Sequence, residues 1–174
     1  MEAKIRDLEI DMDSISFDRI PANDADEMLN LYYANKTSVP HLLWLEKEPT
    51  VAVFLNHFLN KEERPLFMIR GDVAGVREDI GFFWLSSIDH PFKCEAGFCL
   101  MRRFWGKGSD TIVKQAANAI HEESGIDRVF AFTPWPTAKN MVERANFTPV
   151  ALLPGYSKGR DVYGFVHKAE VKEE

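Results

Sequence analysis

The chain has 174 residues, 45% of them hydrophobic, which is enough for one full core, and no shift in composition divides it. Acidic residues outnumber basic ones, 27 against 21, and Lys and Arg are scattered, which argues against a nucleic-acid-binding surface. No apolar run approaches the roughly 18 residues of a membrane helix, and no signal-peptide pattern is present, so we expect a cytoplasmic protein without nucleic-acid or membrane partners.

Hydrophobic periodicity and turn residues predict one domain over 1–168 and a solvated tail at 169–174. In chain order, the predicted elements are a strand at 14–20, a helix within 21–35, one or two short helices within 41–64, strands at 65–73, 79–88 and 94–101, a helix at 108–124, a strand at 128–134, a helix at 137–147, and strands at 148–154 and 161–168. The predicted class is α/β (α+β): a mixed, mostly antiparallel sheet of about seven strands, in the order β-α-α-βββ-α-β-α-ββ, with helices on both faces.

Three smaller patterns refine this prediction. The helix at 108–124 has an apolar stripe made of Ile112, Val113, Ala116, Ala117 and Ile120, and Gly125 at its C-terminal end. Cys94 and Cys99 lie five residues apart in one strand, so they point to opposite faces and we expect two reduced thiols. The histidines and cysteines lack metal-ligand spacing, and no metal site is predicted.

The turn Gly106-Lys107-Gly108 invites comparison with phosphate-binding loops. A nucleotide-triphosphate loop would need a glycine at Met101 and a hydroxyl residue at Gly108, and a dinucleotide fingerprint would need a third glycine at Thr111. Both motifs fail. What remains is a strand end, a bend with two glycines, and a helix whose first amides form a general anion site. A plain tight turn remains the alternative interpretation.

The segment FWGKGSDTIVKQA (104–116) resembles the pyrophosphate loop and helix of the GNAT (Gcn5-related) N-acetyltransferase superfamily, and is most similar to its ribosomal-protein N-terminal acetyltransferase branch. The family motif is Arg or Gln, two residues, Gly, one residue, then Gly or Ala. Arg103, Gly106 and Gly108 match it. A second register places Trp105, Gly108 and Asp110 at these positions, and both registers put the loop 103–109 around the phosphates.

The resemblance continues downstream and covers about residues 79–150. SGIDRVFAF (124–132) matches the link and strand that follow in the family, and KNMVERANF (139–147) resembles the family's helix end. Glu143 and Phe147 are in register there, and Asn146 replaces a glycine, a mild change because asparagine tolerates the left-handed conformation.

The resemblance implies an N-acyltransferase that carries an acetyl group from acetyl-CoA, or another acyl group from its CoA thioester, to a primary amine by direct attack in a ternary complex. The pantetheine arm would lie where the strand ending at Leu100 diverges from the strand 128–134, and an amide near Leu100 would polarise the thioester carbonyl. The implied cofactor-binding residues are Leu100, Met101, Arg102, Arg103, Trp105, Gly106, Lys107, Gly108, Ser109 and Trp135. The acceptor would be a small molecule or a protein N-terminus or lysine, and a homodimer is left open.

For the chemistry, Glu95 is the candidate general base because family members carry a glutamate on that strand, and His90 is the alternative. Val142 stands where the family often has a tyrosine that protonates the departing thiolate, and Trp135 stands where it often has an asparagine. Trp135 either lines the acyl tunnel or simply packs. Two other readings stay open: a GNAT-like protein that binds CoA without catalysis, and an unrelated α+β binding protein.

Overall fold

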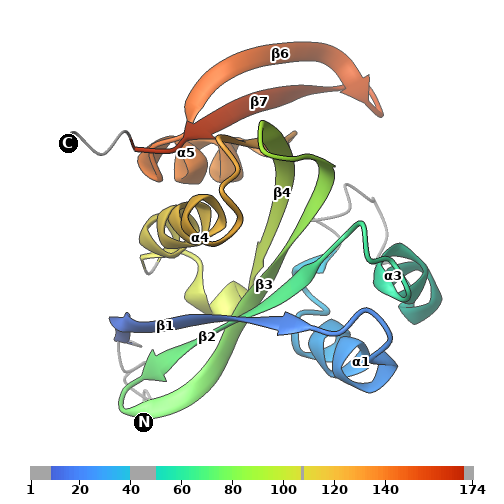
Figure 1. Cartoon of the computed structure of the whole chain (residues 1–174), viewed down its shortest axis with the longest axis vertical. Helices are drawn as coiled ribbons and strands as arrows, with labels where there is room; N and C mark the ends of the chain where they lie inside the picture. The colour runs from blue at the N-terminus through green and yellow to red at the C-terminus, as the bar shows by residue number, and fades with distance from the viewer. Residues whose placement is uncertain (1–8, 40–49, 107, 171–174) are drawn as a thin grey trace, which may run out of the picture.

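The computed structural model describes residues 9–39, 50–106 and 108–170, and within them seven strands form one mixed sheet in the order β1-β2-β3-β4-β5-β7-β6 (Figure 1). The strands are β1 (Ile10–Ile20), β2 (Leu66–Val73), β3 (Val76–Asp89), β4 (Lys93–Leu100), β5 (Arg128–Thr133), β6 (Thr148–Ser157) and β7 (Arg160–Lys168). The helices are α1 (Ala25–Ala34), α3 (Val51–Phe58), α4 (Ser109–Ser124) and α5 (Pro136–Arg144), with a 3-10 turn η1 (Arg102–Phe104).

The predicted class and element order are confirmed, while several boundaries move. The first strand begins at Ile10 instead of residue 14. Strands β6 and β7 both extend toward the turn between them, so that only residues 158 and 159 separate them in the sequence. The alternation of apolar and polar residues alone predicts strands that are too short, because pairing with a neighbouring strand extends their ends. The short helix expected within 41–47 and the loop residue Lys107 lie outside the described residues.

The helices cover both faces of the sheet, with α4 and α5 on one side and α1 and α3 on the other (Figure 1). Strand β3 serves both cores: Phe83 packs in the cluster with α4 and α5, whereas Phe82 packs in the cluster with α1 and α3. Cys94 and Cys99 divide in the same way, and both are free and buried, as predicted. The alternation along a strand therefore holds through the centre of the molecule.

Helix α4 forms as its sequence predicts. All five residues of its apolar stripe are buried. Both of its ends are glycines in the left-handed region, Gly108 at φ 77° and Gly125 at φ 70°, and the Gly125 amide donates to the carbonyl of His121. Because only glycine adopts this conformation without steric cost, these two residues fix where the helix starts and stops.

The sheet is almost divided between β4 and β5. These strands pair in parallel only at Lys93–Glu95 with Arg128–Phe130, and beyond that point β5 continues against β7 alone. The Arg128 amide donates to the Phe92 carbonyl (3.1 Å), and the Met101 amide donates to the Ile80 carbonyl of β3 (2.9 Å). Backbone groups alternate along a strand, so the even-numbered residues of β4 direct theirs toward β5, and those beyond Glu95 face a gap.

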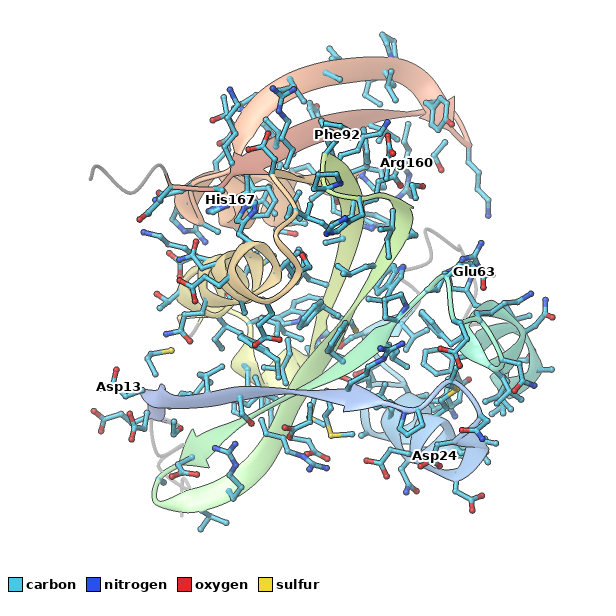
Figure 2. All side chains as sticks on the ribbon, in the orientation of Figure 1. Asp13, Asp24, Glu63, Phe92, Arg160 and His167 are labelled. Atoms are coloured by element: carbon cyan, nitrogen blue, oxygen red, sulfur yellow. The ribbon has the colours of Figure 1, made fainter. Side chains whose placement is uncertain are left out.

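A pair of histidines is buried between α4 and β7. His121 Nδ1 lies 2.6 Å from the Ile126 carbonyl, and its Nε2 lies 3.0 Å from His167 Nδ1. A carbonyl only accepts, so His121 Nδ1 carries the proton, and in the neutral pair His167 Nδ1 donates to His121 Nε2. Figure 2 shows His167 on the side of β7 that faces the helices. Burial lowers the pKa of His167, and the neighbouring His121 and Lys114 lower it further, while Glu170 acts in the opposite direction.

We expect this pair to make the protein less stable in mild acid. Since the pKa of His167 is lower in the folded chain than the unfolded value of about 6.5, the unfolded state binds the proton more readily. The stability that the neutral histidine pair contributes is present in full above pH 6.5. It is lost as the pH falls through the lower pKa that His167 has in the folded protein. Urea unfolding at pH 7.5 and 5.5 should show a decrease that His167→Gln makes smaller. An unchanged decrease in the variant would contradict this assignment.

Candidate active site

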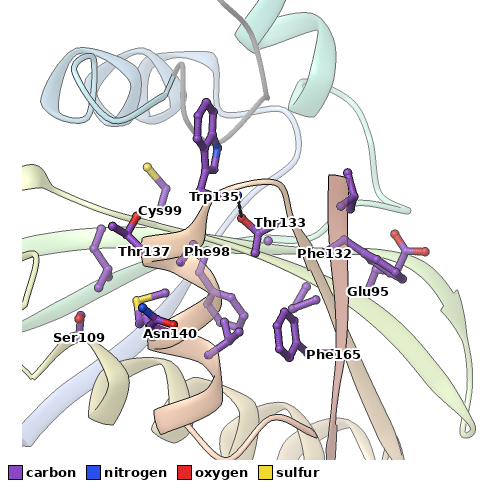
Figure 3. Close-up of a pocket in the computed structure, with 18 of the residues that line it drawn as sticks. Glu95, Phe98, Cys99, Ser109, Phe132, Thr133, Trp135, Thr137, Asn140 and Phe165 are labelled. Carbon is purple, nitrogen blue, oxygen red and sulfur yellow. Dashed lines mark hydrogen bonds between the residues drawn. The ribbon is translucent and has the colours of Figure 1, made fainter. Parts of the chain in front are cut away.

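The gap between β4 and β5 opens into a cavity of about 1000 Å³. Its walls come from the second half of β4, the end of β5, the start of α4, one side of α5 and the inner side of β7 (Figure 3). Of the residues predicted to act here, the structure brings together Glu95, Leu100, Trp105, Gly106, Ser109 and Trp135 at this cavity. A site predicted from scattered positions is thus assembled by the fold, although the role of each residue stays a prediction.

The end of β4 presents its backbone to the cavity. Leu100 is even-numbered in β4, so its amide and carbonyl point into the gap, and its carbonyl accepts a hydrogen bond from the indole Nε1 of Trp105 (2.8 Å). The Met101 amide instead donates to Ile80 on β3. The Leu100 amide thus faces the gap, and its role toward a ligand carbonyl stays a prediction.

The glycine turn that follows is shaped by the backbone of Gly106 and Gly108, both with positive φ. Gly106 and the buried Ser109 line the cavity. A Cβ on Gly108 would overlap the end of the Met12 side chain on β1, so the turn lies against the sheet there. Lys107 lies outside the described residues. The amides at the start of α4 are thereby placed beside the cavity, where they favour an anion.

Two predicted arginines, Met101 and Gly108 are not among the residues that line the cavity. The Arg102 guanidinium lies over the Trp105 ring, 5.9 Å from its centroid. Arg103 lies over Phe104 and pairs with Glu78 of β3. This contact holds Arg103, the arginine of the family motif, against the neighbouring strand. Phosphate binding by either arginine stays a prediction.

Asp110, which the second register places beside the phosphates, is neutralised within the fold. It pairs with Arg144 at the end of α5, with 3.6 Å between Oδ2 and Nε. Arg144 also lines the cavity. A carboxylate at the start of a helix is favoured by the helix dipole, and its pairing with arginine reduces its repulsion toward a bound anion. Sequence reasoning missed Arg144, because nothing in the chain indicates that α5 ends beside the start of α4.

Glu95 lies on the face of the sheet that carries α1 and α3. It pairs in register with Ser86 of β3 and is half-buried. Two positions along the same face, Gly97 leaves room for the Trp84 ring, which a Cβ at residue 97 would overlap. The aromatic ring thus covers the strand between Glu95 and Cys99. His90, the alternative base, is exposed, is not among the residues that line either cavity, and meets the Ser124 carbonyl instead.

A hydroxyl that the sequence did not single out lies at the end of β5. Thr133 is buried and lines the cavity, and its Oγ1 accepts the amide of Trp135 at 3.1 Å (dashed in Figure 3). Since that bond uses only a lone pair, the hydroxyl hydrogen remains available to a partner in the cavity. The neighbouring Trp135 ring lies under the guanidinium of Arg160, 4.6 Å from its centroid. Val142, buried, also lines the cavity where the family tyrosine was expected.

On the α3 side of the cavity, His57 is in contact with the cation Arg64. Arg64 Nη1 lies 3.2 Å from His57 Nδ1 and 3.2 Å from the His57 carbonyl. Arginine keeps its protons, so His57 Nδ1 accepts and the neutral ring carries its proton on Nε2. Burial lowers the pKa of His57, and the charge of Arg64 lowers it further. His57 is therefore held as a neutral ring beside the cavity.

Two other kinds of site were sought in 9–39, 50–106 and 108–170. No group of three or more His, Cys, Asp or Glu side chains there could hold a metal ion. None of the helices in those ranges has the length and apolarity needed to cross a bilayer.

A mixed sheet that splits beside a glycine-bounded helix start, with seven strands in this order, defines a GNAT-like fold. The model of the acetyltransferase (GNAT) domain matches residues 15–136, and the chain belongs to this family.

Solved structures agree with this fold. One is the spermidine N-acetyltransferase from Vibrio cholerae in complex with CoA and spermine: identity is 14%, the TM-score is 0.68, and the match covers 90% of this chain and 96% of that one. Another is RimL, a ribosomal L7/L12 alpha-N-protein acetyltransferase in complex with coenzyme A, with 14% identity, a TM-score of 0.67 and coverage of 90% and 94%. A search of the curated proteins found no match.

Proposed function

We propose that this protein is an N-acyltransferase that moves an acetyl group from acetyl-CoA to a primary amine within a ternary complex. The observation that carries the proposal is the gap between β4 and β5, because the backbone of Leu100 faces it and Glu95 lies on the same cavity. The proposal is supported because a backbone amide that could donate to a carbonyl and a carboxylate that could accept a proton from an amine border the same cavity.

The residues present suit such a thioester. The edge of β4 beyond Glu95 offers ladder groups to an extended arm with amides of its own, as an added strand would meet them. The start of α4 with Ser109, together with Arg144, suits the phosphates. Bound acetyl-CoA supplies the acetyl group in an activated form. The Leu100 carbonyl accepts one hydrogen bond from the Trp105 indole, and its second lone pair remains for a donor on the arm.

In this proposal, one residue acts on each reacting group. Glu95 takes the proton that the ammonium must lose before its nitrogen can attack. The Leu100 amide donates to the carbonyl oxygen as negative charge develops there. The Thr133 hydroxyl donates to the departing sulfur, in place of the tyrosine that Val142 replaces. Holding the two reactants in one orientation supplies much of the rate.

The proposal is tested by following free thiol release from acetyl-CoA with and without a panel of primary amines, with mass spectrometry of the acceptor. Thiol release that needs both the protein and an amine, with the amine acetylated, supports the enzyme. Saturable CoA binding with no acetylated amine would favour the non-catalytic alternative, which the buried Val142 allows. No CoA binding would remove both.

Thr133→Val should lower kcat by about 10²-fold, at the low end of the usual range for a group that assists proton transfer. Valine keeps the shape and removes the hydroxyl, so folding should change little, and the Trp135 amide loses one partner. The loss should be smaller with an acyl thioester whose thiol has a lower pKa, since a better leaving group needs less help. An equal loss with both thioesters would assign Thr133 a structural role instead.

A further inference from the structure

A second, smaller hollow of about 480 Å³ adjoins the main cavity on its α3 side. The two share His57, Ser86 and Glu95 in their walls, and the smaller one adds Glu63, Arg64, Ser87 and Ile88. Figure 2 shows Glu63 on the side of the molecule where α3 lies. Glu95, at the junction, thus faces the proposed thioester site on one side and a polar hollow on the other.

The hollow contains both signs of charge. Glu95 and the exposed Glu63 are acidic, while Arg64 is the cation among its described lining residues. Two hydrogen bonds join the Arg64 guanidinium to His57, both through Nη1, and no carboxylate of the described residues forms an ion pair with it. A half-buried guanidinium braced on one side by a neutral imidazole presents the rest of its fork to the hollow.

Such a fork is suited to a carboxylate, and arginine recognises carboxylates through paired, charge-assisted hydrogen bonds. Glu95 is suited to an ammonium. Ser86 and Ser87 add hydroxyl groups along the same wall. A ligand that satisfies Glu95 and Arg64 together must carry an ammonium and a carboxylate within one small volume, while a ligand with a second ammonium would meet Arg64 with like charge.

We propose that the acceptor is a free α-amino acid, with its carboxylate on Arg64 and its α-amino group at Glu95. This inference rests on the proposed function and names its substrate class. In the reaction the ammonium first gives one proton to Glu95. The nitrogen then forms a bond to the acetyl carbon as the carbon–sulfur bond breaks. A second proton leaves the nitrogen and converts the departing thiolate into the thiol. The products are the N-acetyl amino acid, free thiol and one released proton.

The test compares each amino acid with its decarboxylated counterpart: leucine with 3-methylbutylamine, phenylalanine with phenethylamine, and serine with ethanolamine. The wild-type protein should prefer the amino acid by about 10- to 100-fold in kcat/KM, the range expected for hydrogen bonds to a charged group. Arg64→Met should remove this preference through KM, and Arg64→Lys should restore part of it. Arg19→Met is the control, because Arg19 is an exposed residue of β1 that pairs with Glu62.

A second measurement does not depend on turnover. With CoA present, leucine should raise the melting temperature of the wild-type protein and of Arg19→Met, but not that of Arg64→Met.

The outcomes separate the two proposals. If the simple amines are acetylated as well as or better than the amino acids by the wild-type protein, the substrate class is wrong while the transferase stands. If Arg64→Met keeps the preference, the role of Arg64 is wrong. If neither amines nor amino acids are acetylated, the proposed function itself fails.

Discussion

Replacing Gly108 with valine should abolish the thermal stabilisation that acetyl-CoA gives the wild-type protein. At a ligand concentration 100 times Kd, binding adds about 2.7 kcal/mol to the free energy of unfolding, or roughly 5 to 10 °C for a chain of this size. Gly108 has φ 77°, which a β-branched residue adopts only with strain, and the new Cβ would overlap the Met12 side chain. The turn must shift, and the amides at the start of α4 shift with it.

Gly125→Val is the matched control for this loss. Gly125 lies at the other end of the same helix with φ 70°, and a Cβ there would meet nothing within 4 Å. Both variants therefore carry similar backbone strain and should melt below the wild-type protein, as measured by circular dichroism. Only Gly125→Val should keep the shift caused by acetyl-CoA. A full shift in Gly108→Val, or a loss in both variants, would mean that the turn does not hold the ligand.

Glu95→Gln should lower kcat by about 10²- to 10⁴-fold at neutral pH, the usual range for a general base. Glutamine preserves the size of the side chain opposite Ser86, so the fold should not change, but it cannot accept the ammonium proton. The defect should shrink as the pH rises toward the pKa of the amine, since the acceptor then arrives already neutral. The pH profile of kcat/KM for both proteins measures this.

Glu122→Gln is the control for charge, because Glu122 is exposed on α4 and lines neither cavity. It should match the wild-type protein in rate and pH profile. Acetyl-CoA should stabilise Glu95→Gln as it stabilises the wild-type protein, which separates catalysis from cofactor binding. A Glu95→Gln rate within about threefold of wild type at neutral pH would show that another group, or water, takes the proton.

The features that the sequence predicted depend on residues that are close together in the chain. The alternation along β4 predicted that Cys94 and Cys99 point to opposite faces, and the spacing in α4 predicted its buried stripe, because both patterns follow from backbone geometry alone. The glycines at 108 and 125 marked the ends of α4 for the same reason. The resemblance to a known family then located the divergence of two strands, which no local pattern contains.

What the sequence could not predict depends on contacts between distant elements. Asp110 is paired with Arg144, which lies 34 positions away in the sequence. Arg64 and Glu95 line the same hollow although they lie in different segments of the chain. Each of these arrangements brings together two single residues. It leaves no repeating pattern in the sequence, so hydrophobic periodicity cannot predict it.

The brevity of the β4–β5 pairing has a mechanical consequence. Three residue pairs join the sheet of β1 to β4 to that of β5, β7 and β6, so the backbone is a narrow hinge between two stiffer plates. Helix α4 spans that hinge, because it contacts both β1 and β5, and Gln115 donates to the Met12 carbonyl of β1 at 3.2 Å. The side-chain volumes of this helix therefore contribute to how far the two parts of the sheet open. Evolution can widen or narrow the cleft by changing residues that never touch a substrate.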